Sequence, residues 1–222
     1  MKITRRDFMR YVSLSAVALG LSRVQLDRLG RVLASPSKPP VLWLHGASCT
    51  GCSVSLLNAV NPTVDQLLVQ SISLRYHPTL MAASGDAAVA AARSTADQEP
   101  FILVVEGAIP TAYDGRCCIV WDEGGREVSM AEAVETLAQR ARYVVAVGTC
   151  ASFGGIPARS DLAGAQSLGQ FLGRGTINIP GCPAHPDWII GTLARLLSCE
   201  VPALDNLNRP VAYYTPQVIH ER

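Results

Sequence analysis

Short apolar runs of strand length alternate with helical patterns along most of the chain. The apolar runs lie at residues 41–46, 71–77, 101–107, 143–148 and 176–181. The helical patterns lie at residues 53–68, 85–96, 129–142 and 186–199. Apolar strands that alternate with helices form parallel sheets with both faces covered. The pattern therefore predicts an α/β fold, a flavodoxin-like open parallel sheet with helices on both faces.

Local signals add two helix starts and a hairpin. Ser129 and Glu132 form a capping box at the start of the third helix, and Pro186 suits the first turn of the fourth. Residues 117–128 interrupt the alternation of strands and helices. We expect them to form a hairpin with its turn at Asp122 to Gly125.

Composition limits the class of protein. The 222 residues, of which 49% are hydrophobic, can fill the core of one domain of ordinary size. The 19 basic and 18 acidic side chains give a net charge of +1, which does not indicate binding to nucleic acid. The seven cysteines are an odd number and a modest fraction of the chain, so they do not indicate a disulfide scaffold.

The N-terminus has the features of a twin-arginine signal peptide. Arg5 and Arg6 precede an apolar run at residues 11–21, and a small-residue cleavage site follows at Ala34. The run is shorter than the roughly 20 residues of a membrane span. We therefore expect residues 1–34 to be removed on export to the periplasm, with an amphipathic structural helix as the alternative. This pathway carries folded proteins, often with a cofactor inserted, which favours a bound metal.

Four cysteines follow strands of the predicted sheet. Cys49 and Cys52 come after the first apolar run, Cys150 after the fourth and Cys182 after the fifth. Functional sites of open parallel sheets lie outside the carboxyl ends of the strands, so we expect these cysteines to converge at one edge. Glycines beside them allow close backbone approach, and backbone N–H groups there can donate to cluster sulfurs.

The spacing of the four cysteines leaves three kinds of site open. Four thiolates suit either a structural zinc or an iron–sulfur cluster. One close pair with two distant single cysteines favours a [4Fe–4S] cluster, because structural zinc usually takes its ligands as two close pairs. A thiol–disulfide oxidoreductase also places C-x-x-C after a strand, but it would leave Cys150 and Cys182 without a role.

The remaining three cysteines are expected to be structural. Cys117 and Cys118 are adjacent, so on a strand their side chains face opposite ways and do not suit one ion. Cys199 closes the last predicted helix. A disulfide from Cys199 to an unknown partner is the alternative in an oxidising compartment.

The sequence resembles the small subunit of nickel–iron hydrogenases over nearly its whole length, from Lys2 to His220. The resemblance rests on a set of motifs: RRDFM, WLHGASCTGCSVSLLNA, VVEGAIP, AVGTCASFGGIPA, IPGCPAHPDWIIGTL and NRPVAYYTPQVIH. It implies a flavodoxin-like domain in which Cys49, Cys52, Cys150 and Cys182 bind a proximal [4Fe–4S] cluster. It also implies a large subunit with a nickel–iron centre, where H₂ is split or made.

The resemblance assigns this chain the transfer of electrons and no catalytic residue. The acceptor would be a protein such as a cytochrome, with peripheral membrane association through a partner as a further expectation. The chain would consist of a signal peptide (1–34), a linker (35–40), the cluster domain (41–200) and the start of the family's C-terminal cluster region, truncated (201–222).

Two features depart from the family. The C-terminal region of family members holds cysteines for a medial and a distal cluster, and here only His220 matches a ligand, a histidine of the distal cluster. Many relatives have a glutamate before the first cysteine, where this chain has Ser48. A proton route through that glutamate is therefore not expected here.

Several residues near the same edge have a functional and a structural interpretation. Glu106 follows an apolar strand, and a buried acid needs a partner. We expect it to contact the large subunit or the surroundings of the cluster, with a plain hydrogen-bonded loop acid as the alternative. His45 is expected to be a satisfied polar group, and His185 to line the surroundings of the cluster or cap a helix. Trp43 and Trp188 are expected in packing or in an interface.

The leading hypothesis is an electron-transfer subunit of a periplasmic or cell-envelope [NiFe] hydrogenase. A truncated, non-catalytic or sensory small-subunit remnant is the second hypothesis, and an exported thiol–disulfide oxidoreductase is the third. The related small subunit of respiratory complex I is a weaker match, because that family resembles adjacent cysteines where this chain has C-x-x-C.

Overall fold

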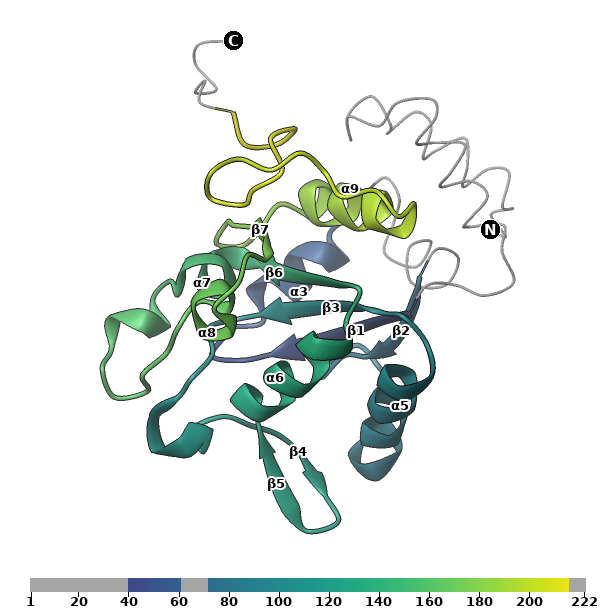
Figure 1. The fold of residues 1–222 in the computed structure, drawn as a ribbon, viewed down its shortest axis with the longest axis vertical. Helices are drawn as coiled ribbons and strands as arrows, with labels where there is room; N and C mark the ends of the chain where they lie inside the picture. Colours follow the sequence, from purple (N-terminus) through teal and green to yellow (C-terminus); the bar gives the residue numbers. More distant parts are fainter. Residues whose placement is uncertain (1–39, 61–71, 216–222) are drawn as a thin grey trace.

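The fold is known from a computed structural model that describes residues 40–60 and 72–215 (Figure 1). The expected signal peptide, the linker up to residue 39 and His220 lie outside the described residues. Pro40, which we expected to end the linker, is already the first residue of a strand.

Five parallel strands form the central sheet in the order β2-β1-β3-β6-β7. The strands are β1 (Pro40–His45), β2 (Ser73–Tyr76), β3 (Ile102–Glu106), β6 (Tyr143–Val147) and β7 (Ile177–Ile179). Each falls within one residue of an expected apolar run or inside it. The strand order reverses direction between β1 and β3, which is the switch point of a flavodoxin-like sheet. The predicted fold class is confirmed.

The carboxyl ends of four strands lie level with one another. His45 pairs with Glu106, Glu106 with Val147, and Val147 with Ile179. The loops that follow these strands therefore leave the sheet side by side, and this edge carries the candidate site.

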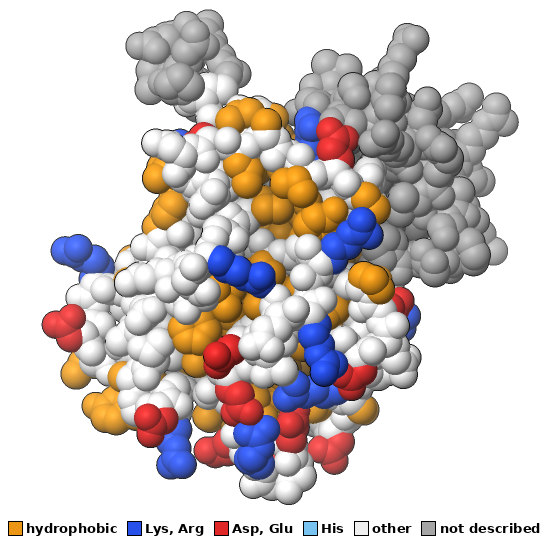
Figure 2. All heavy atoms as spheres, in the orientation of Figure 1, with side chains coloured by type: hydrophobic (Ala, Val, Ile, Leu, Met, Phe, Trp, Pro, Cys, Tyr) orange, Lys and Arg blue, Asp and Glu red, His pale blue; other side chains and the backbone are white. Residues whose placement is uncertain are grey.

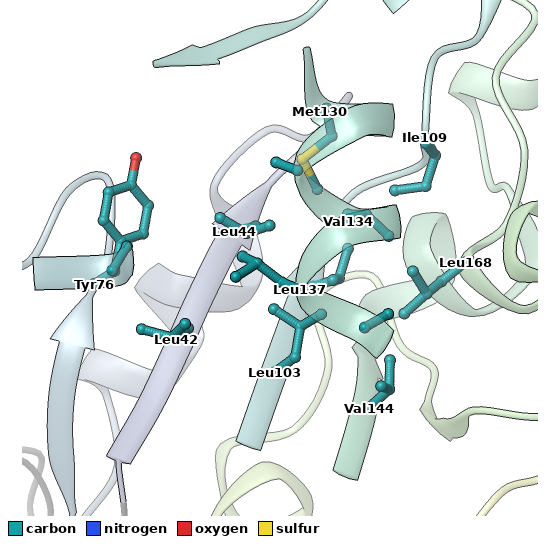
Figure 3. Close-up of a cluster of buried hydrophobic side chains, with 14 of the residues drawn as sticks. Leu42, Leu44, Tyr76, Leu103, Ile109, Met130, Val134, Leu137, Val144 and Leu168 are labelled. Carbon is teal, nitrogen blue, oxygen red and sulfur yellow. The ribbon is translucent and has the colours of Figure 1, made fainter. Parts of the chain in front are cut away.

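Helices cover both faces of the sheet (Figure 1). On one face, α3 (Gly51–Leu57) and α9 (Pro186–Leu197) pack on alternate strand residues such as Val41 and Trp43. On the other face, α5 (Gly85–Gln98) and α6 (Met130–Arg140) cover the strand residues that alternate with these, such as Leu42 and Leu44. Figure 3 shows this second core, in which Leu42 and Leu44 of β1 and Leu103 of β3 lie beneath Val134 and Leu137 of α6.

Two helix starts follow the sequence signals. The Ser129 side chain accepts a hydrogen bond from the backbone N–H of Glu132 at the start of α6. Pro186 is the first residue of α9, and His185 caps it by accepting the backbone N–H of Asp187. Both boundaries are confirmed.

The helix expected at residues 53–68 is wrong in extent. In the structure α3 ends at Leu57, because Asn58 takes a turn conformation that closes the helix. Four short elements were not predicted: α7 (Gly148–Phe153), α8 (Leu168–Leu172) and the 3₁₀ turns η2 (Ala112–Gly115) and η3 (Pro157–Arg159). These elements are too short to show a helical period.

The predicted hairpin is present as β4 (Ile119–Glu123) and β5 (Arg126–Ser129). Gly124 and Gly125 form its turn with φ of 62° and 89°, a conformation that favours glycine. Acidic and basic side chains are mixed over this end of the molecule in Figure 2. Arg126, for example, pairs with both Glu123 and Glu132.

Residues 201–215 lie against β7, the edge strand of the sheet. The backbone N–H of Asn178 donates to the carbonyl of Asn208 at 2.8 Å, and its side-chain amide donates to the carbonyl of Leu207 at 2.9 Å. The Tyr214 hydroxyl donates to the carbonyl of Pro180 at 2.6 Å. The segment thus covers a strand edge that is otherwise open to pairing. In the part of the chain described, no helix has the length and apolar character to cross a membrane.

Candidate functional site

Four cysteines lie at the level carboxyl edge of the sheet. Cys49 is in the loop after β1, and Cys52 is in the first turn of α3. Cys150 is in α7, which starts directly after β6, and Cys182 is in the loop after β7. All seven cysteines of the chain are free thiols in the structure.

The four thiols are close enough to influence one another electrostatically. Burial raises the pKa of Cys52 to about 12, and the thiols of Cys49 and Cys150 add to the rise. Burial also raises the pKa of Cys150, with contributions from Cys182 and Cys49. The structure therefore brings the four cysteines together, and without a bound cation it favours protonated thiols at the two that are most enclosed.

Hydrogen bonds join the loops that carry the cysteines. The backbone N–H of Thr149 donates to the carbonyl of Gly181 at 2.9 Å, and the N–H of Gly181 donates to the Thr149 hydroxyl at 3.1 Å. The Ser55 hydroxyl of α3 donates to the carbonyl of Ala184 at 2.7 Å. The relative positions of Cys52, Cys150 and Cys182 are thus held by the protein itself.

Glycines leave room around three of the cysteine sulfurs. A Cβ at Gly148 would lie 2.5 Å from Cys52 Sγ, and one at Gly155 would lie 2.8 Å from Cys150 Sγ. A Cβ at Gly51 would lie 3.0 Å from Cys49 Sγ. Side chains at these positions would displace the sulfurs. The arrangement fits a bulky group held by several thiolates at once.

A site for one small metal ion is a different arrangement. In residues 40–60 and 72–215, no three His, Cys, Asp or Glu side chains are placed to hold a single ion. A structural zinc needs four ligand atoms at about 2.0–2.3 Å from one point. The assignment of the four cysteines, whether to a zinc ion or to a cluster, stays a prediction.

Glu106 holds the first turn of α3 from beneath. Its side chain is only 2% exposed. Oε1 accepts the backbone N–H of Cys52 at 3.0 Å, and Oε2 accepts the backbone N–H of Ser53 at 3.1 Å. The residue before the helix, Thr50, provides no side-chain cap, so this distant carboxylate takes the place of one. Glu106 therefore has hydrogen-bond partners within the chain, and its expected contact with the large subunit or the cluster surroundings stays a prediction.

More donors converge on the same carboxylate. The Ser53 hydroxyl donates to Oε2 of Glu106 at 2.6 Å, and Trp43 Nε1 donates to it at 3.3 Å. His45 Nε2 lies 3.2 Å from the same oxygen. Burial alone would raise the pKa of Glu106, but the hydrogen bonds from His45 and Ser53 outweigh burial and hold it below its ordinary value. The site therefore contains a buried negative charge at neutral pH.

His77 completes this cluster of polar groups. It is fully buried at the end of β2, and its Nε2 lies 3.1 Å from the Ser53 hydroxyl. Burial, followed by the neighbouring His45, lowers the pKa of His77 to about 4. Ser53 and His77 were not predicted as site residues, although His77 ends an expected apolar run at the same edge and could have been found by the rule that found the cysteines.

The other residues with a sequence-based interpretation lie in structural contacts. The Cys117 thiol donates to the carbonyl of Ala112 at 3.1 Å, and Cys118 packs against the core. Cys199 is exposed at the end of α9. His185 is a helix cap, and Trp188 stacks on Tyr213.

Large apolar side chains are exposed around the cysteines. Val54 is on α3 and Phe153 is on α7, the two helices that carry Cys52 and Cys150. Ile156, just after α7, is 79% exposed. Contiguous exposed apolar surface is typical of a face that a partner covers, and these three residues lie on or directly after the helices that carry two of the cysteines.

The family model described as "NADH ubiquinone oxidoreductase, 20 Kd subunit" matches residues 49–196, a range that includes all four cysteines. The chain is 40% identical to the periplasmic [NiFeSe] hydrogenase small subunit of Desulfomicrobium baculatum, over 100% of this chain and 76% of that protein. It is 38% identical to the periplasmic [NiFe] hydrogenase small subunit 1 of Nitratidesulfovibrio vulgaris, over 99% of this chain and 69% of that protein.

Solved structures agree with these sequence matches. A reduced, active form of the Ni-Fe-Se hydrogenase from Desulfomicrobium baculatum superimposes with a TM-score of 0.76 and 43% identity. The match covers 80% of this chain and 71% of that chain.

Proposed function

The chain belongs to the family of hydrogenase small subunits, the electron-transfer subunits of these enzymes, and we propose on this basis that it relays electrons through one proximal-type [4Fe–4S] cluster. Its ligands would be Cys49, Cys52, Cys150 and Cys182. The observation that carries the proposal is the convergence of four thiols at one sheet edge, with glycines against three of the sulfurs. When bound, such a cluster takes up and gives up one electron at a time.

The residues of this chain would bind and orient that group. The thiols need a bound cation to remain deprotonated, because burial raises the pKa values of Cys52 and Cys150. Glu106 fixes the first turn of α3 and with it the position of Cys52. Gly148 and Gly155 leave the sulfurs of Cys52 and Cys150 free of side-chain contact.

A thiol–disulfide oxidoreductase uses only the C-x-x-C pair, here Cys49 and Cys52. It would leave Cys150 and Cys182, which lie at the same edge of the sheet, without a role.

The exposed apolar residues Val54, Phe153 and Ile156 support a partner that covers the site. We propose that this partner is a hydrogenase large subunit whose nickel–iron centre interconverts H₂ with protons and electrons. The chain would be the small subunit of a heterodimer. We further propose that the electrons pass to a cytochrome-like acceptor, and that the complex associates peripherally with the membrane through that acceptor.

The proposed location is the periplasm. Relatives from Desulfomicrobium baculatum and Nitratidesulfovibrio vulgaris carry the word periplasmic in their names. The paired Arg5 and Arg6 and the cleavage site at Ala34 support export of the folded chain by the twin-arginine route. Residues 201–222 would begin the C-terminal cluster region of the family.

The experiment is an analysis of iron and acid-labile sulfide in the complex, purified anaerobically with its large subunit, together with an EPR spectrum after reduction. We expect about four irons per chain, as a [4Fe–4S] cluster requires. Cys150→Ser should lower the iron content and abolish electron relay. Cys117→Ser, a change at an exposed structural cysteine, is the matched control. Zinc in place of iron, or a fully loaded and active Cys150→Ser complex, would overturn the proposal.

A further inference from the structure

His77 is a buried residue to which the proposed function assigns no role. Its Nδ1 accepts hydrogen bonds from the backbone N–H groups of Thr79 and Leu80, at 3.2 Å and 3.3 Å. A ring nitrogen that accepts two N–H donors carries no proton of its own. Since neutral imidazole has one N–H, that proton is on Nε2, which faces the Ser53 hydroxyl at 3.1 Å.

The donor at His77 Nε2 fixes the direction of the Ser53 hydroxyl. The Ser53 oxygen must accept from His77, so its own hydrogen is left to donate elsewhere. Glu106 Oε2 lies 2.6 Å away and is a strong acceptor. His45 Nε2 lies 3.0 Å from the Ser53 oxygen and 3.2 Å from Glu106 Oε2, and beside a carboxylate it too must be a donor. Ser53 therefore donates to Glu106.

The two oxygens of Glu106 are in different surroundings as a result. Oε2 receives the Ser53 hydroxyl and amide, the Trp43 indole N–H and His45. Oε1 receives the backbone N–H of Cys52 at 3.0 Å. Donors at Oε2 draw the negative charge of the carboxylate away from the oxygen that faces Cys52.

We propose that His77 is a positioning residue that acts through Ser53 and Glu106 to raise the reduction potential of the group held by Cys52. The proposal rests on the proposed function, because it requires a redox group on that cysteine. Reduction adds a negative charge beside Cys52. A carboxylate whose charge is drawn toward Oε2 opposes this addition less than one whose charge faces Cys52.

Two substitutions of His77 separate its contacts. His77→Asn can keep an acceptor near the position of Nδ1 for the backbone of the 78–80 turn, but its side chain is too short to donate to Ser53. His77→Gln places an amide N–H near the position of Nε2 and keeps that donor. If His77 only supported the fold of the turn, the asparagine variant would have the reduction potential of the unaltered protein, and the glutamine variant would have a different one.

The test is a potentiometric titration of the cluster, followed by EPR, in complexes purified with the large subunit. We expect the one-electron equilibrium constant for reduction to fall about threefold in His77→Asn. At 59 mV per tenfold change, this corresponds to a reduction potential that is lower by about 28 mV. His77→Gln should restore the original potential. In a Ser53→Ala background, His77→Asn should have no further effect, because the hydroxyl that His77 directs is gone.

Iron content separates this inference from the proposed function. An unaltered complex without iron would refute the proposed function itself. Fully loaded complexes in which His77→Asn and His77→Gln have the original potential would overturn only the role of His77. If His77→Asn does not retain iron, Ser53→Ala provides the same test, and an unchanged potential in that variant would be contrary to the proposal.

Discussion

The carboxylate of Glu106 accepts the backbone N–H of Cys52 at 3.0 Å, and this bond ties the end of β3 to the first turn of α3. The two residues are 54 positions apart in the chain. The bond exists because β1 and β3 are neighbours whose carboxyl ends lie level. An acid at the end of one strand thus reaches the helix that follows the other. The same contact orients a candidate ligand and adds a negative charge beside it.

Loss of the charge on Glu106 should destabilise the fold. In Glu106→Gln one oxygen becomes an amide N–H₂, which cannot accept, so at least one buried donor loses its partner. We expect a loss of about 2 kcal/mol, which corresponds to a fall in Tm of roughly 4–8 °C. The measurement is thermal unfolding of the purified complex. Glu132→Gln, at an exposed ion pair with Arg126, is the control and should change Tm by no more than about 4 °C.

The glycine beside Cys52 should be needed for cluster binding. In Gly148→Ala the new Cβ would lie 2.5 Å from Cys52 Sγ, in a backbone conformation with φ of +85°. We expect iron content to fall by at least half, as measured on the anaerobically purified complex. The control is Gly173→Ala, with φ of +61° and no atom within 4 Å of the new Cβ. It carries the same kind of backbone strain, so equal iron loss in both variants would contradict a specific role for Gly148.

The strands and the place of the cysteines could be predicted from the sequence. Apolar runs in a parallel sheet are buried on both faces, so their pattern is strong, and the rule for strand ends then places Cys49, Cys52, Cys150 and Cys182 together. The contacts of Glu106 could be predicted only in part. Its burial was expected from the strand before it, whereas its donors come from two other segments, Trp43 and His45 of β1 and Cys52 and Ser53 of α3.

Ser53 has no local signal that marks it as a site residue. It looks like an ordinary helix residue, and its role comes from His77 and Glu106, which lie 24 and 53 positions away. The end of α3 at Leu57 was also missed, because the apolar pattern of the sequence continues past the residue where the backbone turns. Contacts between distant segments decide the role of Ser53, and no period or spacing records them.

The C-terminal segment should depend on Asn178. Its side-chain amide donates to the carbonyl of Leu207, and its side-chain oxygen accepts from the Thr176 hydroxyl. Asn178→Ala leaves both groups without a partner, so we expect local destabilisation of about 1–3 kcal/mol. Hydrogen exchange measured by mass spectrometry should become faster in residues 201–215. Asn58→Ala, which removes an exposed side-chain bond on α3, should leave that segment unchanged.

Acidification should destabilise the fold through His77. Its pKa in the folded chain is lowered from the ordinary 6.5 to about 4 by burial and by His45, while Glu106 acts in the opposite direction. Below about pH 6.5 the unfolded chain therefore binds a proton that the folded chain does not, and stability falls as the pH falls. Between pH 7 and pH 5 this amounts to about 2 kcal/mol, and the additional loss ends near pH 4, where the folded form also takes up the proton.

The comparison of His77 with His77→Gln isolates this contribution, because the other titratable groups are common to both proteins. Urea unfolding of each protein at several pH values gives the difference in unfolding free energy. We expect the difference to change by about 2 kcal/mol between pH 7 and pH 5 in the direction that weakens the unaltered protein. A difference that stays constant over this range would mean that His77 takes up its proton equally in the folded and unfolded states.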